Sequence, residues 1–195
     1  MEIIFIRHGE TPYNLIHSVP DQDVDYTVEL TEKWKEQALT TKELLKNDSF
    51  DAVYSSDMMR AKQTATIIFA DSYDIIFDAR LREASVSQTP WVVYNYGDYS
   101  KEERKDWRLQ WFKDGEPYID QVQRIKEFLL EMSQHTEYKK IAIVTHNGCL
   151  RTLYYIAGTH TLEETLLLER TDNCGVIRTT IDSEGVLKIY SSFYL

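Results

Sequence analysis

Five residues of this sequence have side chains that could carry out one reaction together. They lie in four short stretches, IFIRHGE, YSSDMMR, ARLRE and IVTHNG, which contribute Arg7 and His8, then Arg60, Glu83 and His146. A neutral imidazole is a nucleophile that can accept a phosphoryl group, and guanidinium groups offer paired donors to phosphate oxygens. A second imidazole can donate to the charge that develops on those oxygens, and a carboxyl can protonate the leaving oxygen. These residue types fit a covalent phosphoryl transfer without a metal ion.

Taken singly, each residue also has an ordinary structural explanation. His146 could be a hydrogen-bonded core histidine, Arg60 a solvated helix residue, and Glu83 an ion-pair partner of Arg80 or Arg82. The functional interpretation comes from their joint occurrence, each shortly after a predicted strand. Three other histidines lack this setting and are expected at the surface: His17, His135 and His160.

Hydrophobic patterning supplies the elements that must position these residues. Strands are predicted over residues 2–6, 51–56, 74–79 and 140–146, with two more in the last 23 residues joined by a turn at Ser183–Gly185. Helices are predicted over residues 31–46, 57–70, 119–132 and 148–157. Strands that alternate with helices predict an α/β fold of three layers, αβα, around a mainly parallel sheet.

The ends and faces of these helices are predicted as well. Thr31 can cap the first helix, and Asp57 lies near the N-cap of the second. The predicted buried face of the first helix holds Trp34, Ala38, Thr41 and Leu45, and that of the third holds Ile119, Val122, Ile125, Leu129 and Met132.

The reactive side chains should meet at one edge of the sheet. In open α/β sheets, ligands bind beyond the carboxyl ends of the strands. Each of the four stretches follows a different predicted strand, so each delivers its polar group to that edge. The glycines after the two histidines, Gly9 and Gly148, permit tight turns and a close approach of ligand to backbone. The sequence therefore predicts one phosphate-handling site there.

Residues 84–118 differ from the rest of the chain. They contain eight aromatic residues among many charges, and no clean strand, with at most a short helix near 100–112. We interpret them as an inserted, lid-like segment that sets specificity. Its aromatic rings could stack on the body of a substrate, or they could pack the insertion onto the sheet.

Composition limits the class of protein. The 195 residues are 43% hydrophobic, which suffices for one domain, expected to span residues 1–195. The net charge of −10 disfavours binding to nucleic acid. Two cysteines, Cys149 and Cys174, are typical of a reducing compartment and make no disulfide framework. No signal peptide and no membrane-spanning stretch is evident, so we expect a cytoplasmic protein without membrane contact.

The motifs RHGETPYN, YSSDMMRAKQTA, LRE and VTHNG, in this order, resemble those of the histidine phosphatase superfamily, also called the phosphoglycerate mutase-like family. The resemblance runs from Ile3 to about Val176. It implies that His8 is the phosphorylated nucleophile and Glu83 the proton donor. It implies that the phosphoryl group is bound by four further side chains: Arg7, Asn14, Arg60 and His146. It also implies no cofactor, and a small phosphorylated substrate bound by a monomer or a homodimer.

Other positions either match the family or depart from it. Matching landmarks are Leu30, Thr31, Gln37, Ala38, Gly115, Glu116 and Arg124. Trp34 stands where a glycine is common, Asn147 replaces the usual second glycine after the late histidine, and Pro117 replaces a serine. The loop over 20–29 is acidic where a basic stretch is common. None of these changes removes a proposed catalytic group, but the acidic loop argues against a heavily phosphorylated substrate.

The resemblance leaves the reaction type to be chosen. Mutases of the family are typically longer, with an insertion and a C-terminal tail over the site, whereas this chain is short and ends in a predicted strand. We therefore favour a phosphatase. The alternatives are a phosphoglycerate mutase-type phosphotransferase and a catalytically silent protein that binds a phosphorylated ligand.

The sequence predicts that activity needs no metal ion. It contains no HxxxH or CxxC motif, and the alternating Asp21, Asp23 and Asp25 lack the glycine and distal glutamate of a calcium loop. We expect full phosphatase activity in excess EDTA, measured with p-nitrophenyl phosphate. Complete loss in chelator that zinc or magnesium restores would contradict this mechanism.

Overall fold

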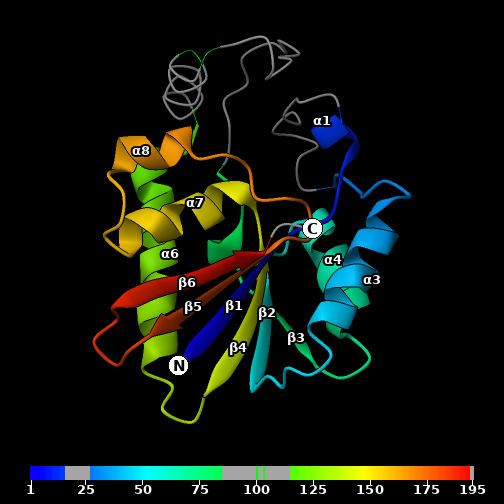
Figure 1. The fold of residues 1–195 in the computed structure, drawn as a ribbon, viewed down its shortest axis with the longest axis horizontal. Coiled ribbons are helices and arrows are strands. Elements are labelled where there is room, and N and C mark those ends of the chain that lie inside the picture. The colour runs from blue at the N-terminus through cyan, green and yellow to red at the C-terminus, as the bar shows by residue number, and fades with distance from the viewer. Residues whose placement is uncertain (16–26, 85–99, 101–102, 104–114, 194–195) are drawn as a thin grey trace.

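The computed structural model describes residues 1–15, 27–84, 100, 103 and 115–193, and in this part of the chain one six-stranded sheet carries helices on both faces (Figure 1). The strands are β1 (Glu2–Arg7), β2 (Ala52–Ser55), β3 (Ile75–Phe77), β4 (Lys140–Thr145), β5 (Val176–Ile181) and β6 (Leu187–Phe193). The helices are α1 (Pro12–Leu15), α3 (Trp34–Leu44), α4 (Met59–Phe69), α6 (Tyr118–Ser133), α7 (Asn147–Ile156) and α8 (Leu162–Leu167), with a 3-10 turn over Ala79–Leu81.

The strand order is β3-β2-β4-β1-β5-β6. The first four strands in this order are parallel to one another. β5 pairs antiparallel with β1, and β6 pairs antiparallel with β5. The predicted three-layer α/β fold and the two C-terminal strands are therefore confirmed. Because β1 lies beside β4 and β4 beside β2, the carboxyl ends of these three strands meet at one edge.

Successive residues of β1 enter two different cores. Ile3 and Phe5 pack into the cluster formed with α6 and α7, and Ile4 and Ile6 into the cluster formed with α3 and α4. This follows from the alternation of side chains along a strand. With both faces covered, the whole strand is apolar, which explains why EIIFI has no polar alternation.

One predicted helix cap is wrong. Helix α3 begins at Trp34 with Lys33 at its N-cap, because the Thr31 hydroxyl donates to Glu10 Oε1 instead, at 2.9 Å. Helix α4 has Met58 at its N-cap, so Asp57 lies next to the cap as predicted, and its carboxylate forms an ion pair with Arg82. Both side chains are thus bound by a residue from another part of the chain. The predicted buried face of α3 is confirmed.

The predicted face of α6 is wrong at one position. Ile119 is 49% exposed, whereas Gln121 is fully buried. At 100° per residue, Ile119 lies about 120° from Ile125, at the centre of the buried face, while Gln121 lies only about 40° away. The four other predicted residues of this face are buried: Val122, Ile125, Leu129 and Met132.

Helix α8 was not predicted from the sequence. Its signal was a capping box, in which the Thr161 hydroxyl accepts from the Glu164 backbone and the Glu164 carboxylate accepts from the Thr161 backbone. The helix has only six residues, too few for a clear hydrophobic period.

Most of the predicted insertion at 84–118 lies outside the described residues, so the single-domain, lid-bearing organisation stays a prediction. Within the described part of the chain, none of the helices has the length and apolar character to cross a bilayer.

Candidate active site

Strand register brings the two predicted histidines together. Arg7 at the end of β1 pairs with Thr145 at the end of β4, so His8 and His146 follow side by side. Their ring centroids lie 5.1 Å apart, and both side chains are buried. The predicted meeting of these residues at one edge is therefore what the structure shows.

His8 is held as a neutral imidazole. Its Nδ1 lies 2.7 Å from the carbonyl oxygen of Gly9, and because a carbonyl only accepts, Nδ1 carries the ring proton and Nε2 keeps its lone pair. Burial, together with the charges of Arg60 and Arg7, lowers the pKa of His8 well below 6.5. The imidazole is therefore neutral at physiological pH, as a nucleophile toward phosphorus must be.

His146 is oriented by Ser56, which the sequence analysis did not select. His146 Nε2 lies 2.8 Å from Ser56 Oγ, and this hydroxyl also accepts from the Met58 backbone. Burial and Arg60 lower the pKa of His146 well below 6.5. Ser56 Oγ can donate to Nε2 or accept from it, and where it donates, the ring proton is on Nδ1. Nδ1 is buried without a partner among the described residues. Nδ1 is thus available to a ligand oxygen.

Two buried guanidiniums flank the histidines. Arg7 Nη1 donates to the Thr171 carbonyl at 2.5 Å, and its Nε is buried without a partner in the described part of the chain. Burial and the nearby Arg170 lower the pKa of Arg7 to about 9. Arg60 is buried in the first turn of α4. Burying two guanidiniums close together is costly, so this arrangement favours a bound anion.

Glu83 is held by N–H donors and forms neither of the ion pairs considered from sequence. Its Oε2 accepts from the Gly148 backbone at 2.9 Å, and its Oε1 accepts from Gln121 Nε2 at 3.0 Å and from the Ala84 backbone at 3.1 Å. The neighbouring arginines have other partners: Arg80 pairs with Asp78 and Glu131, and Arg82 with Asp57. The carboxyl is therefore fixed against the first turn of α7, directly after His146.

Asn14 is linked to His8 through Asn173. Asn14 Oδ1 accepts from the Thr11 backbone at 3.0 Å and from Asn173 Nδ2 at 3.1 Å. The same Asn173 nitrogen donates to the His8 carbonyl at 3.0 Å. The connection between α8 and β5 thus organises the site, although the sequence analysis found no signal in it. This connection acts through backbone and amide contacts, which do not produce a recognisable sequence motif.

The connection between α8 and β5 also contains a strained residue. Cys174 has a φ of 60°, in the left-handed region, and non-glycine residues adopt it at some energetic cost. Its N–H is shared between the Arg7 and His8 carbonyls, and Thr41 Oγ1 donates to its carbonyl at 2.8 Å. Burial raises the pKa of the Cys174 thiol to about 12, so the sulfur is not a nucleophile here.

Several family landmarks support the loop that carries His8. Gln37 Oε1 accepts from the Glu10 backbone, Gln63 Oε1 from the Leu30 backbone, and Thr64 Oγ1 from the Gly9 backbone. On the other side of the sheet, Arg124 forms a two-pronged ion pair with Glu116 and donates to the Arg80 carbonyl. This pair fixes the turn that leads to Glu83.

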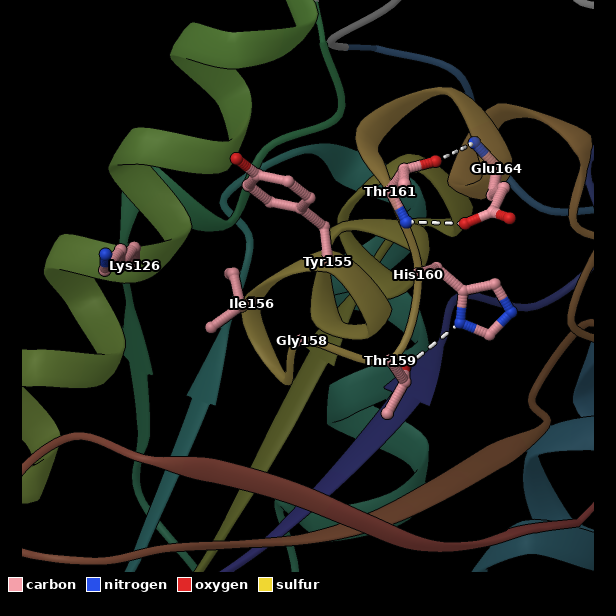
Figure 2. Close-up of a pocket in the computed structure, with 8 residues that line it drawn as sticks. All are labelled: Lys126, Tyr155, Ile156, Gly158, Thr159, His160, Thr161 and Glu164. Carbon is pink, nitrogen blue, oxygen red and sulfur yellow. Dashed lines mark hydrogen bonds between the residues drawn. The ribbon is translucent and has the colours of Figure 1, made fainter.

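A depression of about 550 Å³ is lined by none of these residues (Figure 2). It is lined by Lys126 of α6, by Tyr155 of α7 and by the connection from α7 to α8, including His160. Figure 2 shows that its polar atoms serve local structure, since Thr161 and Glu164 cap α8 and Thr159 bonds His160. It contains none of the predicted site residues.

Both described histidines expected at the surface, His135 and His160, are partly exposed.

Among the described residues, no group of three or more His, Cys, Asp or Glu side chains could hold a metal ion. The Asp21–Asp25 stretch and His17 lie outside the described residues.

Comparison with known proteins identifies the family. The sequence matches the histidine phosphatase superfamily (branch 1) over residues 3–190. The chain therefore belongs to the histidine phosphatase superfamily, and the resemblance seen in its motifs is confirmed.

The relatives include proteins named as phosphoglycerate mutase-like and proteins named as phosphatases. The chain is 30% identical to phosphoglycerate mutase-like protein 4 of Arabidopsis thaliana, over 78% of this chain and 69% of the relative. It is 28% identical to the adenosylcobalamin/alpha-ribazole phosphatase of Escherichia coli K12, over 78% of this chain and 77% of that one. The structure of YhfR from Bacillus stearothermophilus superimposes with a TM-score of 0.80 at 24% identity, covering 100% of this chain and 97% of YhfR. That likeness shows a shared fold.

The contact between Gly148 and Glu83 gives a direct test of the carboxyl's position. A Cβ atom at residue 148 would lie 2.0 Å from Glu83 Oε1, the end of a side chain that can rotate away. Gly148→Ala should therefore displace the carboxyl, retain the fold, and slow the hydrolysis of alkyl phosphates by roughly 10- to 100-fold. Melting temperature and steady-state rates measure the two effects.

The same substitution in a Glu83→Gln background is the matched control. There Gly148→Ala should add little further loss, because the group that it displaces is already disabled. Independent, additive losses would show that Gly148 acts on something other than Glu83.

Proposed function

We propose that this protein is a phosphatase that hydrolyses a phosphomonoester of a small metabolite through a phosphohistidine on His8. The observation that carries the proposal is the state of His8: a buried, neutral imidazole with its proton on Nδ1 and its Nε2 lone pair free, beside two guanidiniums. Membership of the superfamily and the phosphatases among its relatives support the same reaction.

In the first step, Nε2 of His8 attacks phosphorus and the bond from phosphorus to the ester oxygen breaks. Glu83, as the acid, gives its proton to the departing alkoxide, which leaves as an alcohol. In the second step, water attacks the phosphohistidine and gives a proton to the Glu83 carboxylate. The nitrogen–phosphorus bond breaks, phosphate leaves, and His8 and Glu83 return to their starting forms.

The phosphoryl oxygens are bound by the unpartnered donors of the site. Arg7 Nε and His146 Nδ1 are buried beside His8 without partners in the described part of the chain, and burial of such groups is favourable when an anion accepts from them. Arg60 adds a second guanidinium. Asn14 completes the set, since its Oδ1 already receives two N–H groups and its own amide nitrogen can donate to a phosphoryl oxygen.

Four further parts of the proposal come from the sequence analysis: metal independence, enzyme type, compartment and domain organisation. The reaction requires no metal ion or cofactor, and the enzyme is of the histidine acid phosphatase type. It works in the cytoplasm as one domain, with the 84–118 segment as an inserted lid over the site, as a monomer or a homodimer. A mutase that returns the phosphoryl group to its substrate is the second candidate, favoured by the 30% identical mutase-like relative.

Loss of the nucleophile tests the covalent route. His8→Ala should retain the fold and lose nearly all phosphatase activity, because no other group can accept the phosphoryl. In the wild type, rapid quench with a labelled substrate should leave acid-labile, base-stable phosphate on His8. His135→Ala, which changes a half-exposed histidine far from the sheet edge, is the control and should turn over normally. Wild-type turnover by His8→Ala would overturn the proposal.

The proton donor is tested by the choice of leaving group. Glu83→Gln should slow hydrolysis of alkyl phosphates by roughly 10²- to 10⁴-fold, the usual contribution of general acid catalysis. It should slow p-nitrophenyl phosphate far less, because nitrophenolate leaves without a proton. Equal loss on both substrates would mean that Glu83 is a positioning group and that the acid lies elsewhere.

A further inference from the structure

Gln121 is an unexpected residue on the buried face of α6. Its side chain is fully buried, on the same face as Ile125 and Leu129, which belong to the hydrophobic core formed with α6 and α7. A primary amide has two donor hydrogens and an acceptor oxygen that need partners when water is excluded. An apolar residue of similar size would fill this position without that requirement.

The amide of Gln121 is only half satisfied. Its Nε2 donates to Glu83 Oε1 at 3.0 Å and lies 3.4 Å from Cys149 Sγ. Its Oε1 is buried and has no hydrogen-bond partner among the described residues. A buried acceptor without a partner destabilises the folded state. Gln121 therefore lowers the stability of the folded state, but in this position its amide donates a hydrogen bond to Glu83.

Together with the Gly148 contact to Oε2, this bond sets the rotation of the Glu83 carboxyl. The other two recorded donors to Glu83 are backbone amides, from Gly148 and Ala84. Gly148 holds Oε2, and Ala84 is the next residue along the chain and moves with Glu83 itself. Gln121, from α6, is the contact that ties Oε1 to a separate and rigid element.

The contact with Cys149 does not explain why an amide is buried at position 121. Its thiol donates to the Arg82 carbonyl at 3.0 Å, and burial raises its pKa to about 11, so it stays protonated. The thiol therefore packs beside the amide without competing for Glu83.

We propose that Gln121 is a positioning residue for proton transfer by Glu83, retained in the core at the expense of stability. It holds Oε1 so that the rest of the carboxyl faces the ester oxygen beside His8. This inference rests on the proposed phosphatase function. It predicts that loss of Gln121 affects the proton-transfer step alone and leaves phosphate binding and attack by His8 intact.

The test is Gln121→Leu, assayed on an alkyl phosphate and on p-nitrophenyl phosphate. Loss of a hydrogen bond to an ionisable group should slow the alkyl phosphate by roughly 10- to 100-fold. The rate with p-nitrophenyl phosphate should stay within about 2-fold, since its leaving group needs no proton. The melting temperature should be unchanged or higher, because the variant removes a buried unpaired oxygen. A merely structural role would lower the melting temperature and both rates together.

Two further variants complete the experiment. Gln123→Leu removes an exposed glutamine of the same helix, bonded to Glu127, and should change neither rate. Gln121→Met keeps the side chain's length without its polar atoms, and should repeat the split between substrates if leucine does not fit.

The outcomes separate the inference from the proposed function. A wild type that hydrolyses neither substrate and forms no phosphohistidine overturns the phosphatase and this inference with it. An active wild type whose Gln121→Leu and Gln121→Met variants keep the alkyl phosphate rate, or lose both rates equally, overturns the inference alone. A further loss when Gln121→Leu is added to Glu83→Gln also overturns it, since a residue that acts through Glu83 has nothing left to position.

Discussion

The pairing of β1 with β4 is the constraint on which the rest of the site depends. Parallel strands place their carboxyl ends at the same edge, and the register that sets Arg7 opposite Thr145 puts His8 and His146 in contact. The pairing of β4 with β2 sets Ser55 opposite Val144, and Ser56 then meets the ring of His146. A shift of two residues in either pairing would separate these groups by about 7 Å. Both faces of these strands are buried, which pins the register through packing on two sides.

Burial determines the charge state of this cluster. Desolvation disfavours a charged imidazole, and the nearby guanidiniums disfavour it further, so both histidines stay neutral. The site therefore sets two neutral imidazoles beside two buried guanidinium groups. An anion bound there would relieve the repulsion between the guanidiniums and accept from Arg7 Nε, which has no partner among the described residues.

His8 and the Glu83 carboxyl are held in different ways. The chain around His8 is supported from several elements, through Thr64, Gln37 and Asn173. Glu83 depends on the first turn of α7 and on one side chain of α6. Because His146 directly precedes α7, a single rigid helix relates the carboxyl to the histidine pair. A proton donor must lie close to the leaving oxygen, and this common support is what maintains the distance.

By itself, the sequence indicated the strands and most of the helices, and the residues that meet at one edge of the sheet. Short apolar runs such as residues 2–6 can only be buried, and motifs ending in Arg7, His8 and His146 carry their chemistry in their side-chain types. Only the tertiary structure decided the competition among partners. The Thr31 hydroxyl bonds Glu10 rather than its own helix, Glu83 bonds α7 rather than an arginine, and Gln121 turns inward where Ile119 was expected. In each case the side chain takes the partner that gives the lower free energy, either a neighbour in sequence or a group from an element far along the chain. The local sequence does not contain the free energy of the long-range contact, because the distant group comes near only when the sheet has formed.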